Sequence, residues 1–553
     1  MEIENRSKLR LKLVFLLILF FFVVILLRLF YIQVIDRAKY QKLAELQQIR
    51  KIELKAKRGN IYDRNGVLLA TTVEASSFAI DPQLVRKDSL AMVQLFSFAN
   101  ILGIPNEQIN SFLNSKRNFQ WLRRGLIEYP PSLDTFGFQG LIVSKEPRRF
   151  YLFGKALSNV IGITNLDNSG ITGLELALDS VLKGVDGFAF FLRDARGQLI
   201  PNFDLPSVNP INGKDIQLTI DINLQRISSY FLQDGIEKTR SKGGCVIAMN
   251  PRNGEILAMV SFPQFNPNNS QSWNETIDKN YAVNFLFEPG STLKPIIAAI
   301  ALQRKIASPD EIFNAFDGKF LIGDVQITDE HPASKLTLEE AIIYSSNIVF
   351  SQISGRIPPE ILLSELSKFG FGKKVGIEIA GELSGSIPQA NNLTSIQQKF
   401  LGFGYGLSVT PIQLAAAYTA IANEGEMVKP RITLAQSKFM LKDTIIQRET
   451  AEKLKEMLVK VVEFGTAVET KIEGIKIAGK TGTAQKFTDG AYSKTQYINS
   501  FVGFLPAENP KILILVMLDE PQSSIYASST VVPIFKKIVL AIYNSPLLHQ
   551  LLE

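Results

Sequence analysis

The chain has 553 residues, which is enough for two or more domains with full hydrophobic cores. Its 60 basic and 53 acidic residues leave a net charge of +7, which is not gathered into any long basic run. Together with the lack of a zinc-ligand or RNP-like pattern, this argues against a nucleic-acid partner and suits a protein that works beside anionic lipid and an acidic polymer.

Cysteine and histidine are nearly absent. The single cysteine, Cys245, cannot form an internal disulfide, and its apolar surroundings predict an inert core thiol. The two histidines, His331 and His549, lack the partners of a zinc site, and neither is well placed to activate a serine. The sequence therefore argues against a Ser-His-Asp hydrolase, and we expect neither a metal nor an organic cofactor.

An apolar run begins close to the N-terminus. Residues 13–27 contain no polar side chain, and the run continues beyond Arg28. Residues 13–35 are long enough to cross a bilayer as a helix. A cleaved signal peptide is the alternative, but no small-residue cleavage site follows the run. We therefore predict an uncleaved transmembrane anchor at 13–35.

Basic residues precede this run at positions 6, 8, 10 and 12. By the positive-inside rule, residues 1–12 form a cytoplasmic tail. Everything after residue 36 then lies on the outer, periplasmic side of the inner (plasma) membrane. The sequence predicts a single-pass membrane protein that acts in the cell envelope.

Residues 36–215 are predicted to form a non-catalytic module. Glycines between apolar residues in 58–70 indicate strand, turn and strand, and apolar spacing in 88–116 indicates helix. We find no catalytic constellation here, and no paired carboxylates suited to glycosyl transfer. The composition changes near 210–215, so we place the domain boundary between 215 and 216.

Residues 216–553 are predicted to form the second domain. Asn253-Gly254 between two apolar runs predicts a hairpin. The order of elements describes an α+β sandwich with an antiparallel sheet flanked by helices. Strands are expected at 216–220, 246–250, 256–260, 475–478, 500–504 and 512–518, and helices at 224–237, 291–303, 411–423 and 532–543.

Three short motifs in this domain occur in the order of one known catalytic constellation. Spacing alone is weak evidence, because Ser180 and Lys183 have the same separation but lack a preceding Pro-Gly turn, and are predicted to lie on a solvated helix face. Context gives the three motifs their weight. They are Ser291-Thr-Leu-Lys294, Ser345-Ser-Asn347 and Lys480-Thr481-Gly482-Thr483, which read as Ser-x-x-Lys, Ser-x-Asn and Lys-Thr-Gly.

The first two motifs predict an activated serine. The turn before Ser291 places it at a helix N-terminus, one turn from Lys294, so we expect the two side chains to hydrogen-bond. Lys294 has to be neutral to accept the serine proton, and burial or a second cation, Lys480, lowers a lysine pKa. Ser345 would relay a proton towards the leaving amine, and Asn347 would orient Lys294 and hold a substrate amide.

The third motif is expected to lie on a strand. Gly482 has no side chain and would let an extended substrate approach the strand edge. Lys480 and the hydroxyls of Thr481 and Thr483 would receive a substrate carboxylate. The backbone N–H groups of Ser291 and Thr483 would form an oxyanion hole.

Over almost the whole chain these motifs resemble class B penicillin-binding proteins, the monofunctional peptidoglycan D,D-transpeptidases. Residues 58–66 and 170–175 look like signatures of that family's pedestal, or dimerisation-like, module, and 287–295, 402–414 and 480–485 look like its transpeptidase core. Lys-Thr-Gly with Ser-Ser-Asn looks closer to the division-specific FtsI group than to the elongation group.

The resemblance implies a reaction and a set of partners. Ser291 would attack the penultimate D-Ala carbonyl of a peptidoglycan stem peptide, and an amine of a neighbouring stem would resolve the acyl-enzyme. β-Lactam antibiotics would acylate the same serine. The partner would be a polytopic glycosyltransferase of the division machinery, contacted through the anchor and the pedestal.

Other functions remain open at this stage. An elongation-type transpeptidase, a D,D-carboxypeptidase and a β-lactamase would carry the same motifs, because the motifs do not distinguish an amine from water as the acceptor. A β-lactam-sensing receptor needs a signalling domain, and twelve residues before the anchor are too few to fold as one. A scaffold with a vestigial site is disfavoured because every motif residue is present.

Overall fold

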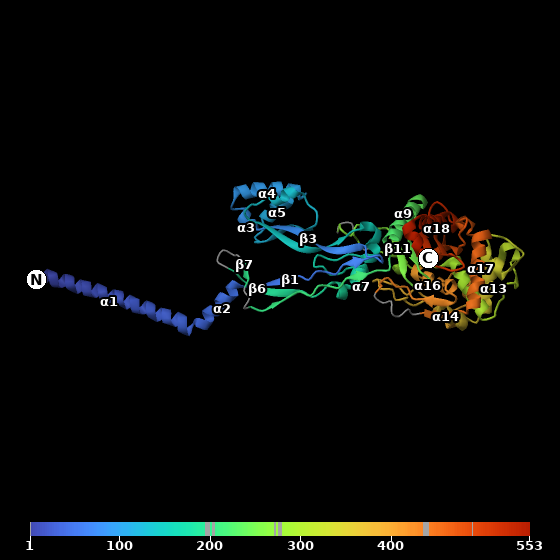
Figure 1. Cartoon of the computed structure of the whole chain (residues 1–553), viewed down its shortest axis with the longest axis horizontal. Coiled ribbons are helices and arrows are strands. Elements are labelled where there is room, and N and C mark those ends of the chain that lie inside the picture. Colours follow the sequence, from blue (N-terminus) through green and yellow to red (C-terminus); the bar gives the residue numbers. More distant parts are fainter. Residues whose placement is uncertain are drawn as a thin grey trace. The chain divides into compact units, whose positions relative to one another are not determined.

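The computed structural model describes residues 2–193, 199–201, 205–269, 273–274, 279–323, 325–434, 442–488 and 490–552. Contacts divide the chain into two compact units. The first contains residues 1–57 and 184–213, and the second contains 58–183 and 214–553. Figure 1 shows their elements along the chain.

The first unit consists of helices followed by a small antiparallel sheet. β6 is its central strand and pairs with β1, β7 and β8. Its elements are α1 (Glu2–Phe30), the π-helical turn η1 (Tyr31–Ile35), α2 (Arg37–Gln48), β1 (Ile49–Leu54), β6 (Gly187–Arg193), β7 (Leu199–Pro201) and β8 (Ser207–Val208).

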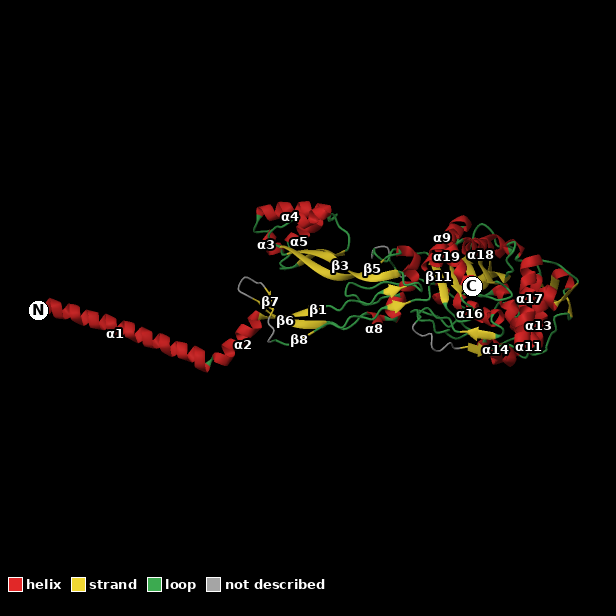
Figure 2. Cartoon of the chain, in the orientation of Figure 1, coloured by secondary structure: helices red, strands yellow, loops and turns green. Residues whose placement is uncertain are grey.

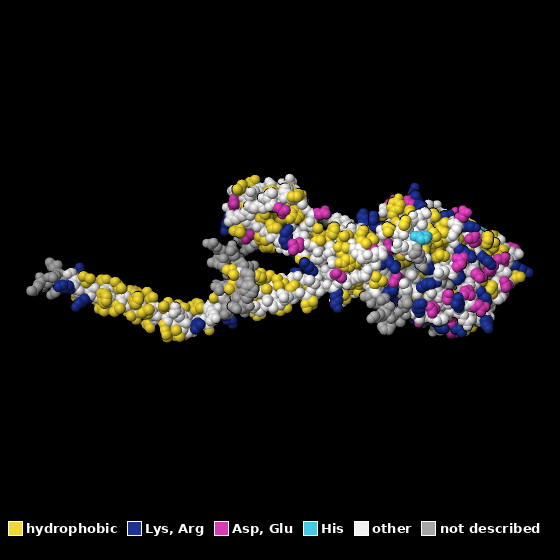
Figure 3. Space-filling view, viewed as in Figure 1, with side chains coloured by type: hydrophobic (Ala, Val, Ile, Leu, Met, Phe, Trp, Pro, Cys, Tyr) yellow, Lys and Arg dark blue, Asp and Glu magenta, His cyan; other side chains and the backbone are white. Residues whose placement is uncertain are grey.

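The predicted N-terminal apolar helix is confirmed. Ser7–Ile35 is long and apolar enough to cross a membrane, and none of it is buried within the protein. Figure 3 shows hydrophobic side chains covering most of α1, with basic side chains near its beginning. An exposed apolar surface of this length is costly in water and suits a lipid environment.

The second unit begins with a sheet in the order β4-β3-β2-β9, with β5 also paired to β3. The predicted helical stretch 88–116 is two helices rather than one, because Gly103 adopts a φ of 65° and Pro105 starts a new helix. The elements are β2 (Ile61–Tyr62), β3 (Leu68–Ile80), α3 (Pro82–Val85), α4 (Ser89–Ile101), α5 (Asn106–Leu113), β4 (Gln120–Leu126), β5 (Leu141–Tyr151), α6 (Ser158–Ile161), α7 (Gly173–Ala177), α8 (Asp179–Leu182) and β9 (Ile216–Gln217).

The larger sheet of this unit has five antiparallel strands in the order β11-β10-β20-β19-β18. Every residue of β20 is buried, and side chains alternate between the two faces of a strand, so both faces of the sheet are covered. The helices around it are visible in Figure 2. The strands are β10 (Gly243–Met249), β11 (Ile256–Phe262), β18 (Ala478–Thr488), β19 (Ala491–Leu505) and β20 (Ile512–Asp519).

Helices and short strands complete the unit. The principal helices are α9 (Ile222–Thr239), α11 (Lys294–Gln303), α12 (Leu338–Ile343), α13 (Asn347–Arg356), α14 (Pro359–Lys368), α15 (Ser395–Leu401), α16 (Pro411–Ala422), α17 (Arg448–Phe464) and α18 (Ala527–Asn544). The smaller elements are α10 (Tyr281–Asn284), η5 (Gly290–Leu293), β12 (Ile312–Asn314), β13 (Lys319–Ile322), β14 (Val325–Thr328), β15 (Lys335–Thr337), β16 (Glu426–Val428), β17 (Lys442–Thr444) and α19 (Pro546–His549).

This architecture confirms the predicted α+β class and the hairpin at Asn253-Gly254, which joins β10 to β11. Three strand predictions were wrong in extent. The strand expected at 216–220 is only Ile216–Gln217, and the strand expected at 475–478 starts at Ala478 and runs to Thr488. The strand expected at 500–504 is the end of β19, which runs from Ala491 to Leu505. The second difference arises because pairing with the long β19 continues through the Lys-Thr-Gly motif.

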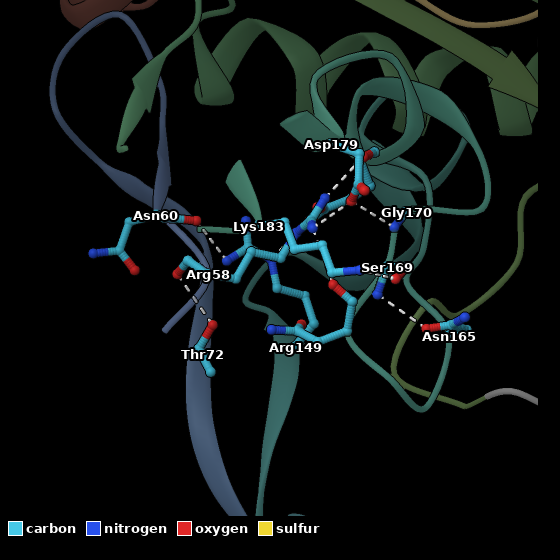
Figure 4. A network of polar contacts seen from close by, with 12 residues as sticks. Arg58, Asn60, Thr72, Arg149, Asn165, Ser169, Gly170, Asp179 and Lys183 are labelled. Carbon is cyan, nitrogen blue, oxygen red and sulfur yellow. Dashed lines mark hydrogen bonds and ion pairs between the residues drawn. The ribbon is translucent and has the colours of Figure 1, made fainter. Parts of the chain in front are cut away.

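A buried ionic cluster joins β-strand and helix segments near the start of the second unit (Figure 4). Glu175 accepts hydrogen bonds from Arg58 Nε at 2.5 Å and from Arg149 Nε at 2.6 Å. Arg58 also donates to Asp179 at 2.6 Å, and Arg149 donates to the Gly59 carbonyl at 2.7 Å. Two cations therefore meet two anions, and the side chains of Arg58, Arg149 and Glu175 have almost no exposed surface, while that of Asp179 is partly exposed.

We expect Glu175→Gln to lower the free energy of unfolding by about 3–5 kcal/mol, because it leaves the buried Arg149 guanidinium without a matching charge and removes one of the two carboxylates that pair with Arg58. Urea denaturation of the detergent-solubilised chain, followed by circular dichroism, measures this. Glu449→Gln is the matched control, since its ion pair with Lys453 is exposed, and it should leave the denaturation midpoint unchanged. Equal midpoints for the two variants would contradict a stabilising role of the cluster.

Candidate active site

The three sequence motifs meet at one cleft. Ser291, Ser345, Asn347, Thr481 and Thr483 line it, and the side chains of Lys294 and Lys480 are fully buried behind it. The cleft is also lined by residues that the sequence did not single out, namely Glu330, Tyr405, Thr466, Tyr526, Ala527 and Ser528.

Ser291 lies in a 3-10 turn that leads directly into α11. The turn, η5, ends at Leu293, and α11 begins at Lys294 with Pro295 in its first turn. Gly290 has a φ of 56°, which favours glycine, and its N–H donates to the Gly404 carbonyl at 3.1 Å. The backbone of Ser291 is therefore held by the Gly290–Gly404 hydrogen bond on its N-terminal side and by α11 on its C-terminal side.

Lys294 makes a different contact from the one predicted. Its Nζ donates to the Ser345 carbonyl at 2.5 Å and to Asn347 Oδ1 at 2.8 Å, and it lies 3.1 Å from Ser345 Oγ. The predicted hydrogen bond between Ser291 and Lys294 is absent from the described structure. Two strong carbonyl acceptors on the next motif hold the amine instead.

Ser345 is the point at which the two lysines meet. Lys480 Nζ donates to its hydroxyl at 2.9 Å. Ser345 adopts a φ of 60°, a left-handed conformation that is unusual for a residue other than glycine and that is often found at functional sites. In this conformation both its carbonyl and its hydroxyl face the buried amines.

Asp329 anchors the start of α13, which carries Asn347. Its carboxylate accepts from the Ser346 hydroxyl at 2.5 Å, the Asn347 N–H at 2.6 Å and the Ile348 N–H at 3.1 Å. Asn347 Nδ2 donates in turn to the Thr328 carbonyl at 2.9 Å. A carboxylate at this helix N-terminus satisfies otherwise unpaired N–H groups and fixes the asparagine that holds Lys294.

Burial dominates the electrostatics of the two lysines. It lowers the pKa of Lys294 to about 7, while the negative charges of Asp329 and Glu330 oppose this shift. The pKa of Lys480 is lowered well below its ordinary value, first by burial and then by the positive charge of Lys294. The second cation therefore acts on Lys480, and desolvation is what lowers the pKa of Lys294.

The Lys-Thr-Gly motif lies on β18, which is an edge strand of the five-stranded sheet. The Gln485 N–H points away from β19 and donates to Tyr405 Oη at 3.1 Å. N–H groups two residues apart on a strand face the same side, so the Thr483 N–H also faces the open edge. Thr481 shares a hydrogen bond of 2.9 Å with Thr466.

Gly482 makes room for the serine segment. A Cβ at this position would lie 2.7 Å from Ser500 Oγ, 2.8 Å from Thr292 Cγ2 and 3.0 Å from the Pro289 carbonyl oxygen. The glycine therefore allows β18 to pack closely against η5, which brings Thr481 and Thr483 to the cleft.

We expect Gly482→Ala to destabilise the protein by about 1–3 kcal/mol, because the added methyl group overpacks the contact between β18 and η5. Gly355→Ala is the matched control. It lies inside α13, where the new methyl would meet only Lys399 at 3.4 Å, and alanine favours a helix by about 0.5–1 kcal/mol. Urea denaturation should move the two midpoints in opposite directions, and a shift of both in the same direction would refute the packing role.

Asp329, Tyr405 and Glu330 are among the residues that sequence reasoning missed. Asp329 precedes Ser345 by sixteen positions and has no local signature, since its role depends on β14 ending beside α13. Tyr405 lies in the glycine-rich segment 402–406, which the sequence marked as a family resemblance without a role for the tyrosine.

Family comparisons agree with the geometry of the cleft. The family model described as the penicillin-binding protein transpeptidase domain matches residues 244–540, and that of the penicillin-binding protein dimerisation domain matches residues 53–218. The chain belongs to the class B penicillin-binding proteins.

Curated relatives extend over nearly the whole chain. Peptidoglycan D,D-transpeptidase FtsI of Escherichia coli is 30% identical over 93% of this chain and 87% of its own length. Stage V sporulation protein D of Bacillus subtilis is 32% identical over 92% of this chain and 81% of its own. The probable peptidoglycan D,D-transpeptidase PenA of Neisseria meningitidis is 31% identical over 92% and 88%, respectively.

Solved structures share the fold. Penicillin-binding protein 3 of Mycobacterium tuberculosis, crystallised with aztreonam, has a TM-score of 0.67 and 26% identity, over 89% of this chain and 96% of that one. The transpeptidase domain of penicillin-binding protein 3 from Burkholderia pseudomallei has a TM-score of 0.54 and 31% identity, over 60% of this chain and 97% of that one.

Proposed function

We propose that this protein is a peptidoglycan D,D-transpeptidase that cross-links stem peptides through an acyl-enzyme on Ser291. The observation that carries the proposal is the Ser345 hydroxyl, which lies within 3.1 Å of one buried lysine and 2.9 Å of another, in the cleft that Ser291 lines. Such an arrangement can move protons between a serine and an amine without a histidine.

In the first step Lys294 acts as the base. In its neutral form its two N–H groups donate to the Ser345 carbonyl and Asn347 Oδ1, which leaves the lone pair for the Ser291 proton. Ser291 Oγ then attacks the penultimate D-Ala carbonyl. The outward-facing Thr483 N–H and the Ser291 N–H stabilise the oxyanion.

The remaining residues of the site bind and release the donor. The terminal carboxylate of the stem lies against Lys480, Thr481 and Thr483, and its charge raises the pKa of Lys480 on binding. Ser345 carries a proton towards the departing amine, so that D-alanine leaves as the acyl-enzyme forms. Gly482 contributes indirectly, by its packing against η5. β-Lactams acylate the same serine, in line with the aztreonam complex of the tuberculosis relative.

The N-terminal apolar run and the basic residues before it support a membrane location and a topology for the chain. Residues 13–35 span the plasma membrane once, residues 1–12 lie in the cytoplasm, residues 36–215 form the pedestal module, and residues 216–553 form the transpeptidase domain. Basic residues before the apolar run support this orientation. The FtsI names among the relatives support a septal role. The partner that we propose from the family resemblance is a polytopic glycosyltransferase of the division machinery.

A D,D-carboxypeptidase would form the same acyl-enzyme and pass it to water. The open cleft does not favour water over an amine, so the two functions differ only in the second step. A synthetic stem pentapeptide with an added amine acceptor separates them, because transfer yields a new amide and hydrolysis yields a free acid.

We expect Ser291→Ala to abolish covalent labelling by fluorescent penicillin, because it removes the attacking oxygen. The measurement is gel fluorescence with intact mass on the detergent-solubilised chain. Ser180→Ala is the matched control, since Ser180 begins the other Ser-x-x-Lys spacing on α8 and is exposed, and it should label like the wild type. A Ser291→Ala protein that still gains one adduct would remove Ser291 from its role.

The acylation rate should rise with pH through about 7, the pKa of Lys294, because only the neutral amine accepts the serine proton. Below that pH the rate should fall by about tenfold for each pH unit. The profile is measured by quenching penicillin labelling at fixed times between pH 5.5 and 8.5. Equal labelling at the end point at every pH is the control that the protein stays folded. A flat profile would exclude Lys294 as the base.

A further inference from the structure

Glu330 is a carboxylate on the wall of the active-site cleft. It lines the cleft together with Ser291, Ser345 and Asn347, and its side chain is exposed. Within the described part of the chain it has no hydrogen bond and no ion pair. Its neighbour Asp329, by contrast, uses both carboxylate oxygens at the start of α13.

The backbone that carries Glu330 is held in place. The Asp329 N–H donates to the Gly318 carbonyl at 3.1 Å, and the Asp329 carboxylate accepts from Ser346 and Asn347. Asn347 binds the Thr328 carbonyl on the same segment. Glu330 thus follows a residue that is tied to the catalytic motif, and its position relative to the cleft is set by that motif.

Glu330 provides the charge on the described surface of the cleft. Among the described side chains that line the cleft, Glu330 is the only carboxylate or cation, and the other ionisable groups there are Tyr405 and Tyr526. Lys294 and Lys480 have no exposed surface. Burial is the main influence on the pKa of both lysines, and the Glu330 carboxylate opposes it in each case, which indicates that its field reaches the reacting groups.

We infer that Glu330 binds the cationic amine of the acceptor stem peptide and so determines acceptor specificity in the second step. The inference rests on the proposed transpeptidase function. A stem-peptide side-chain amine is an ammonium ion at neutral pH, whereas the donor brings a carboxylate. The exposed Glu330 carboxylate therefore favours the ammonium of the acceptor over the carboxylate of the donor, which separates the two substrates by charge.

In the second step the acceptor nitrogen loses two protons. The bound ammonium gives one proton to the neutral amine of Lys294, and the resulting amine attacks the ester carbonyl of the acyl-enzyme. The C–N bond forms and the bond between the carbonyl carbon and Ser291 Oγ breaks. The second proton of the amine nitrogen passes to Ser291 Oγ, which restores the hydroxyl, and Lys294 releases the first proton to solvent.

Glu330→Gln in the full chain tests this inference. The donor is a synthetic stem pentapeptide, and the acceptors are a stem peptide with a free side-chain amine and hydroxylamine, which is uncharged at neutral pH. Transfer is normalised to the penicillin acylation rate of the same preparation. Glu473→Gln is the matched control, because Glu473 is exposed and does not line the cleft.

We expect Glu330→Gln to raise the stem-peptide concentration for half-maximal transfer by about ten- to a hundredfold, the size of a hydrogen bond to a charged group. Normalised transfer to hydroxylamine should match the wild type, Glu330→Asp should restore part of the stem-peptide transfer, and Glu473→Gln should change neither.

Two results would overturn the inference. One is an unchanged half-maximal concentration in Glu330→Gln, and the other is an equal loss with the uncharged acceptor. A wild-type protein that labels with penicillin but transfers to neither acceptor would instead overturn the proposed transpeptidase function. This failure shows in the wild type alone, whereas the two results above are seen by comparing Glu330→Gln with the wild type.

Discussion

The active site depends on the burial of a lysine amine among oxygen acceptors. Lys294 has no exposed surface, and the cost of desolvating a charge there lowers its pKa to about 7. The Ser345 carbonyl and Asn347 Oδ1 hold it in place, so these two groups have to come from a rigid part of the fold. Asp329 supplies that rigidity by fixing the start of α13.

Two kinds of buried charge occur in this protein, and they serve different ends. Around Glu175, opposite charges are matched by short hydrogen bonds, which hold the chain at Arg58, β5 and α7 together. At the cleft, two buried lysines approach one hydroxyl, and burial is the main reason why the pKa of each is lowered. Matched buried charges favour a fixed structure, and an amine buried without a matching charge is a reactive one.

The edge of the five-stranded sheet links this chemistry to a substrate. β18 has no strand beyond it among the described residues, and the Thr483 N–H faces that open edge. Packing at Gly482 brings the strand against the serine segment, while Tyr405 closes the edge two residues further along. The strand therefore offers a short length of free backbone directly beside Ser291.

The sequence by itself determined the α+β class, the apolar N-terminal helix, the hairpin at Asn253-Gly254 and the three motifs whose residues meet at the cleft. These features depend on local periodicity, turn chemistry and short motifs, which are legible along one chain. Only the tertiary structure decided that Lys294 contacts Ser345 and Asn347 rather than Ser291, that Gly482 serves packing, and that Asp329 and Glu330 reach the site. Those contacts join segments up to two hundred residues apart along the chain. Which acceptor binds the Lys294 amine depends on distances in the folded protein, and the local sequence does not encode them.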